Sequence, residues 1–245
     1  MAIADRDLFW HASTIIMNAK ERLQAAHRAA MEGRHEEALT EYIWFHHHAL
    51  QEDTAYYGVR LSFALGYWIE LGESYPPALE ALCEIRDKNL RLLESGHHRR
   101  EIFHDFAVIN DRLREREKTA RLFQLLESQD LAFATKCAPL AMEALVEVGD
   151  FHRAAKYLPE PVARIAKQAL QLNQDITDLP DHPRLKAANY RANVDIFVKK
   201  LRLIMTVLSG ADRGSEAAAC REAGLAALIP RTLRKKVERA LEKGA

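Results

Sequence analysis

The chain has 245 residues, 48% hydrophobic and 29% charged, which is typical of a globular protein and unlike a disordered or membrane-spanning one. Its ten glycines and eight prolines make up about 7% of the residues, against a usual ~12%, and a sheet-rich fold would need more turns. Thirty-five basic residues balance 35 acidic ones, so no overall charge attracts nucleic acid or an anionic membrane.

Apolar residues recur at helical spacing along nearly the whole chain, which predicts an all-α protein. Helices are predicted at roughly 6–32, 35–51, 54–72, 76–94, 98–114, 116–128, 131–148, 150–158, 160–174, 184–209, 215–228 and 230–243. Five glycines are expected in the left-handed conformation at helix ends: Gly33, Gly72, Gly96, Gly149 and Gly210.

The irregular stretch 175–183 carries two prolines and three aspartates. It is the candidate boundary between a helical array over 1–174 and C-terminal helices over 184–245 that continue or cap the array. At the N-terminus, Asp5 and Asp7 precede an apolar run too short to cross a bilayer and wrongly charged for a signal peptide. Three cysteines without a Cys-x-x-Cys pair fit a reducing compartment. These features predict a cytoplasmic protein that does not enter a membrane.

Four segments share one pattern, in which a tight turn leads into a helix that opens with alanine. The alanines are Ala38, Ala78, Ala120 and Ala154. A small residue at this position lets the two helices of a hairpin approach closely, and large apolar residues on the following turns fill the space behind it. Neighbouring hairpins must then stack, because each one buries its apolar face poorly alone.

This pattern resembles the tetratricopeptide repeat family over roughly residues 19–158, with degenerate repeats. The second unit carries the best match, in Leu65, Gly66, Gly72, Ala78, Leu82 and Ile85. The resemblance implies an α-solenoid of about 12 helices in stacked antiparallel hairpins, with a concave groove that binds a protein or peptide partner.

Mapping the chain onto the family pattern gives the residues expected in the groove: Lys20, Gln24, His27, Arg60, Tyr67 and Arg112. The same mapping places Asp105, Lys136 and Glu143 toward the concave face. Arg60, Tyr67 and Arg112 would supply hydrogen bonds to the ligand. Phe63 and Phe106 map to the same face, and the core between repeats is the favoured interpretation, with a place in the groove as the alternative. The predicted function is a non-enzymatic interaction scaffold, monomeric or homodimeric, without a cofactor.

Three adjacent histidines, His46 to His48, cannot ligate one ion from one helix, because successive residues point ~100° apart. His46 continues an apolar stripe and is expected to be buried, whereas Trp44, His47 and His48 form a possible exposed contact patch. His97 and His98 follow a glycine and are expected in an exposed turn, with a metal pair of His98 and His104 as the weaker alternative. Glu101 and His104 have di-iron spacing, but the second copy this site needs falls on a predicted turn. No metal site is predicted.

The segment 230–243 places Leu233, Val237 and Leu241 on one stripe of a helix that is otherwise basic. This pattern predicts a cap on the preceding helices. Two alternative functions stay open: a nucleic-acid-associated protein that uses this basic helix, which the zero net charge argues against, and a helical enzyme with an unrecognised site.

Overall fold

The computed structural model describes residues 17–243, and every regular element among them is helical, which confirms the all-α class. The helices are α1 (Ala19–Met31), α2 (His35–Glu52), α3 (Tyr56–Val59), η1 (Arg60–Ala64), α4 (Leu65–Ser74), α5 (Pro76–Glu94), α6 (Arg100–Arg112), α7 (Arg116–Gln129), α8 (Leu131–Glu147), α9 (Phe151–Lys156), α10 (Pro161–Thr177), α11 (Pro183–Gly210), α12 (Gly214–Ala226) and α13 (Arg231–Glu242). The predicted helix 54–72 contains a π-helical turn, η1. The start predicted at residue 6 lies outside the described residues.

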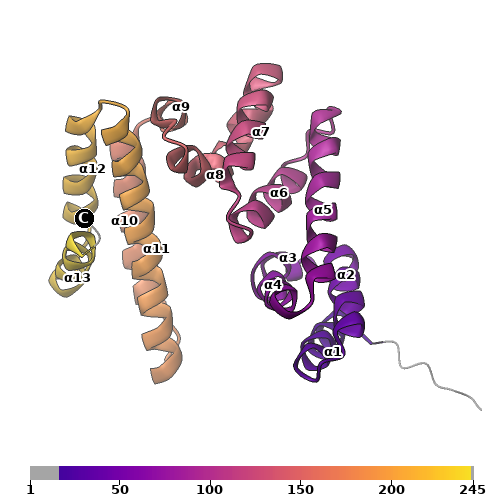
Figure 1. Ribbon diagram of the computed structural model, residues 1–245. Coiled ribbons are helices and arrows are strands. Elements are labelled where there is room, and N and C mark those ends of the chain that lie inside the picture. Colours follow the sequence, from indigo (N-terminus) through magenta and orange to yellow (C-terminus); the bar gives the residue numbers. More distant parts are fainter. Residues whose placement is uncertain (1–16, 244–245) are drawn as a thin grey trace, which may run out of the picture. The chain divides into compact units, whose positions relative to one another are not determined.

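The chain forms two compact units, which divide within α5, between Lys88 and Asn89. The boundary expected at 175–183 is therefore not where the chain divides, because α10 packs against both α11 and α12 across that loop. Figure 1 shows these three helices in orange and yellow. No helix within residues 17–243 combines the length and the hydropathy needed to cross a membrane.

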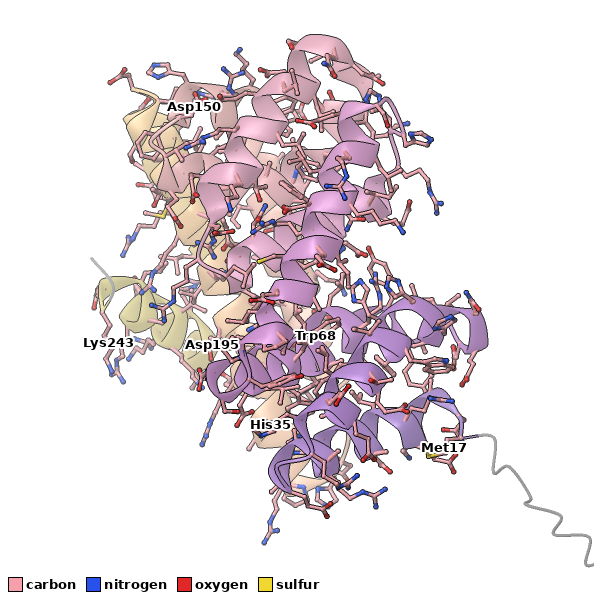
Figure 2. The ribbon with its side chains drawn as sticks, turned by 45° about the vertical axis from the view of Figure 1, so that its right-hand side comes forward. Met17, His35, Trp68, Asp150, Asp195 and Lys243 are labelled. Carbon is pink, nitrogen blue, oxygen red and sulfur yellow. The ribbon has the colours of Figure 1, made fainter. Side chains whose placement is uncertain are left out.

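In the first unit, α1 and α2 form a hairpin. Asn18 caps α1 through a reciprocal pair of hydrogen bonds with Glu21, and Gly33 turns the chain with φ +77°. Ala38, at the start of α2, is fully buried, as the pattern predicted. Trp68, labelled in Figure 2, is also buried, and its indole Nε1 donates to the carbonyl of Ala78 at 2.7 Å.

In the second unit, α6 and α7 pack against α8, and α9 contacts both α8 and α11. One apolar cluster joins residues of α6 through α13. Ala120 and Ala154 are buried in it, as the predicted hairpin pattern requires. A single core therefore connects the middle of the chain with its C-terminal helices.

Two of the five glycines expected at left-handed helix ends have a different role. Gly33, Gly96 and Gly149 do have positive φ. Gly72 and Gly210 instead lie within helices α4 and α11, and a Cβ there would stand 2.4 Å from Leu79 Cγ and 2.3 Å from Phe151 Cγ, respectively. These two glycines are required by close packing between elements, not by backbone conformation.

The C-terminal helix α13 covers α11 and α12 as predicted, with Leu233, Val237 and Leu241 all buried. Arg234 Nη2 donates to the carbonyl of Leu228 at 2.9 Å. One of the basic residues of α13 therefore also binds the backbone of the segment between α12 and α13. The side chains of α13 can be followed in Figure 2 as far as Lys243.

The loop before α13 is held by Asn173, a buried residue of α10. Its Nδ2 donates to the carbonyl of Ala227 at 2.9 Å, and its Oδ1 accepts from the backbone N–H of Ile229 at 3.1 Å. Both ends of the amide are thus used to fix the entry into α13.

Candidate functional site

His46 is buried as predicted, but so is Arg60, which was expected to face a groove. Arg60 Nη1 donates to His46 Nε2 at 3.1 Å, and the guanidinium lies 5.8 Å from the ring centre of Tyr57. Arg60 opens the π-helical turn η1. Its role is therefore to pair with a buried histidine, and its side chain is not displayed to a ligand.

Burial, the charge of Arg60 and the neighbouring His47 lower the pKa of His46 to about 3. The unfolded chain binds a proton near pH 6.5, so His46 contributes stability that is fully present above that pH and is lost as the pH falls toward 3. By about pH 5, we expect a loss of about 2 kcal/mol in the free energy of unfolding.

The variant His46→Gln should lack this component, because an amide oxygen can accept from Arg60 without titrating. Urea unfolding from about pH 7.5 to about pH 5, followed by tryptophan fluorescence, measures the difference. All three tryptophans precede residue 89, so the signal reports the first unit. Equal pH dependence in the two proteins would contradict the assignment.

The side chains of the expected contact patch, Trp44, His47 and His48, interact largely with other residues of the first unit. The Arg22 guanidinium lies 4.2 Å from the ring centre of Trp44 and also forms an ion pair with Glu41 at 2.8 Å. The His48 ring stacks on Trp44 and donates from Nδ1 to its carbonyl. Trp44 and His48 are half-buried, and His47 is exposed.

The structure places the other expected groove residues in both units. Lys20 and Gln24 are exposed on α1, and His27 stacks on Tyr67 with ring centres 4.2 Å apart. Arg112 ends α6, in the second unit.

The two phenylalanines assigned to the core differ: Phe106 is buried, but Phe63 is 67% exposed. His98, expected to be exposed, is half-buried and stacks on Phe133. Its Nδ1 donates to Asp130, the N-cap of α8, at 2.9 Å.

The second unit contains three adjoining cavities that share Pro139, an exposed residue inside α8. We call them together the Pro139 groove. Their volumes are about 230, 360 and 660 Å³, and we refer to them in this order as the first, second and third cavities. Pro139 has no N–H, so the carbonyl of Thr135, which lines the third cavity, loses its usual helical partner.

Six elements supply the lining of the Pro139 groove. The first cavity is lined by α6, α7, α8 and α11, the second by α8, α10, α11 and Leu158, and the third by α7, α8, α9, α10 and the segment before α10. The second cavity has an apolar wall of Met142, Leu158, Ile196, Leu203 and Ile204. Ile196 is 52% exposed and Leu131, in the third cavity, is 62% exposed.

Glu143 lines both the first and the second cavity. It forms ion pairs with Arg116 and with Lys199, both at 2.8 Å. Arg116 also pairs with Asp111 and with Glu147. This network connects α7, α8 and α11, so it fixes the wall between the first and second cavities.

In the third cavity, Glu127 accepts a hydrogen bond from the Tyr157 hydroxyl at 2.7 Å and forms an ion pair with Arg153. Burial and this carboxylate raise the pKa of Tyr157, so the phenol stays protonated at neutral pH. Burial also raises the pKa of the Cys137 thiol, on α8, to about 12. Neither group is an activated nucleophile.

Sequence reasoning placed Glu143 toward a groove but missed the rest of the Pro139 groove. The available signal was a proline in the middle of the predicted helix 131–148, where the residue disrupts a helical hydrogen bond. Within residues 17–243, no three His, Cys, Asp or Glu side chains gather in a way that could hold a metal ion. No protein-family model, no curated protein and no solved structure matches this chain.

Proposed function

We propose that the chain is a non-enzymatic interaction protein whose Pro139 groove binds a peptide segment of a partner protein. The observation that carries the proposal is the apolar wall of the second cavity, where Ile196 meets solvent beside the buried Met142 and Ile204. Solvent-facing apolar surface within a concave, partly charged site is typical of ligand and peptide recognition.

Two further observations support the proposal. The buried alanines at the starts of α2 and α9 agree with the resemblance to tetratricopeptide repeats, a type of fold that presents grooves to peptides. The groove is also formed mainly by packed helices, with one short segment before α10, so its shape is set before a ligand arrives. Such preorganisation lowers the entropic cost of binding.

A random-peptide display library selected on the purified chain tests this function. We expect enriched peptides to bind at least ~10-fold more weakly to Ile196→Asp, because a carboxylate would stand in the apolar wall. Leu170→Asp is the matched control, since Leu170 is 56% exposed on α10 and does not line the groove.

Both variants should keep the circular dichroism and melting temperature of the parent, since both positions are exposed. The proposal fails if no peptide is enriched, or if the enriched peptides bind Ile196→Asp and the parent equally well.

A second candidate function is supported by the surface of α13. Within the described part of the chain, the six basic residues that follow Pro230 form no ion pair and are all exposed: Arg231, Arg234, Lys235, Lys236, Arg239 and Lys243. Such a surface could contact nucleic-acid phosphates. Binding of a mixed-sequence oligonucleotide that weakens steeply with salt, and is lost in Lys235→Glu/Arg239→Glu, would favour this function.

A further inference from the structure

The acidic residues that line the Pro139 groove are all paired with cations of the second unit. Asp111 pairs with Arg116, Glu127 pairs with Arg153, and Glu143 pairs with both Arg116 and Lys199. Arg116 is shared with Glu147, and Arg153 with Asp150, so the ion pairs hold these carboxylates in place without cancelling their charge completely.

Three cations of the same lining are not paired with a carboxylate within residues 17–243. Lys156, Arg164 and Lys200 are exposed, and within residues 17–243 none of them forms an ion pair. Arg164 lines both the second and the third cavity, Lys200 lines the second and Lys156 the third. The second and third cavities are lined by four cations, Lys156, Arg164, Lys199 and Lys200, and by two carboxylates, Glu127 and Glu143, so the formal charge of their lining is +2.

The cations border apolar space. The second cavity, of about 360 Å³, places Lys200 and Arg164 beside Leu158, Leu203 and Ile204. The third cavity continues from Arg164 to the exposed Leu131. A ligand complementary to both features must carry apolar groups between anionic ones.

We infer that the occupant of the Pro139 groove is an acidic amphipathic segment of a partner protein. Its carboxylates pair with Arg164, Lys200 and Lys156, and its apolar side chains enter the second cavity. This inference rests on the proposed peptide-binding function and specifies the partner's chemistry.

A single-stranded nucleic acid would also bring several anions, but its bases need aromatic surfaces on which to stack. Among the described residues that line the groove, Tyr157 is the only Phe, Tyr or Trp, and its hydroxyl is held by Glu127. The apolar wall is aliphatic, so it fits leucine-like side chains better than bases.

Fluorescence anisotropy with defined peptides tests the inference. The probe is acetylated, amidated Glu-Leu-Leu-Glu-Glu-Leu-Leu-Glu carrying a fluorophore, with Lys-Leu-Leu-Lys-Lys-Leu-Leu-Lys and Glu-Ser-Ser-Glu-Glu-Ser-Ser-Glu as comparisons. We expect the acidic, leucine-containing probe to bind at least ~10-fold more tightly than either comparison, and its affinity to fall with salt.

Arg164→Glu and Lys200→Glu should each lower the affinity for the acidic probe by ~5–10-fold, because each replaces an attraction by a repulsion. Lys167→Glu is the matched control: Lys167 is an exposed cation on the same helix as Arg164 but does not line the groove. Arg164→Gln separates loss of charge from repulsion and should give an intermediate affinity.

Equal binding of the basic or the serine probe, or an unchanged affinity in Arg164→Glu, would overturn the inference. The library selection separates this failure from a failure of the proposed function. If the selected peptides depend on Ile196 but are not acidic, the groove binds peptides and only the inferred charge is wrong. If the binding of no selected peptide depends on Ile196, both the proposed function and the inferred charge of the partner are wrong.

Discussion

Deletion of residues 230–245 is expected to make the chain aggregate. The deletion removes Leu233, Val237 and Leu241, three buried side chains that cover α11 and α12. Each contributes on the order of 1.5–3 kcal/mol by burial, before entropy is considered. Leu225 and Leu228, now buried, would face solvent. The deletion begins after Ile229, so the hydrogen bonds of Asn173 to the preceding loop can persist.

Light scattering and size-exclusion chromatography measure the aggregation, and thermal unfolding measures the stability. Val237→Asp tests the same face of α13 without deleting any residues. It should destabilise the fold strongly because it buries a charge. Lys235→Glu is the control, since Lys235 is exposed and forms no ion pair within residues 17–243, whereas Arg234 holds the carbonyl of Leu228. A truncated chain that stays monomeric and equally stable would show that α13 is not a cap.

Gly210→Ala is expected to destabilise the second unit by about 2–3 kcal/mol, at the upper end of the usual cost of overpacking. The added Cβ would stand 2.3–2.7 Å from Cγ, Cδ2 and Cδ1 of Phe151. These atoms lie at the near side of a rigid ring, so a small rotation does not relieve the clash. The gain of up to about 1 kcal/mol from replacing glycine inside a helix is too small to offset it.

Gly214→Ala is the matched control, because Gly214 opens α12 and a Cβ added there would meet no atom within 4 Å. Its effect should stay within about 0.5 kcal/mol. Chemical unfolding of both variants, and of each in a Phe151→Ala background, measures the coupling. We expect Gly210→Ala to lose most of its cost when Phe151 is absent. An equal cost in both backgrounds would place the strain elsewhere.

Features of single helices were largely predictable. The apolar stripe of α13 and the buried position of His46 follow from one periodicity, which is set by the helix itself. Ala38 and Ala154 were recognisable because a turn and the following helix lie close together in sequence. Gly33 and Gly149 were correctly placed, since a left-handed helix end is a local backbone property.

Contacts between distant elements were not predictable. Arg60 has the sequence pattern of a surface residue. In the structure it is buried, and its guanidinium donates a hydrogen bond to His46. Gly210 does end α11, but nothing near it in the sequence reveals that the ring of Phe151 leaves no room for a Cβ there. Periodicity predicts the direction in which a side chain leaves its own helix. It does not predict which residue of another helix contacts that side chain.

The amino-acid sequence by itself determined the helical class, most helix ends and the buried stripe of each amphipathic helix, because local hydrogen bonding and apolar spacing fix these properties. Only the tertiary structure decided that Arg164, Lys200 and Glu143 share the Pro139 groove, and which of their charges are compensated. The physical reason is that a groove is the space left between helices. Its shape and charge depend on how α8, α10 and α11 pack, and no single segment encodes that packing.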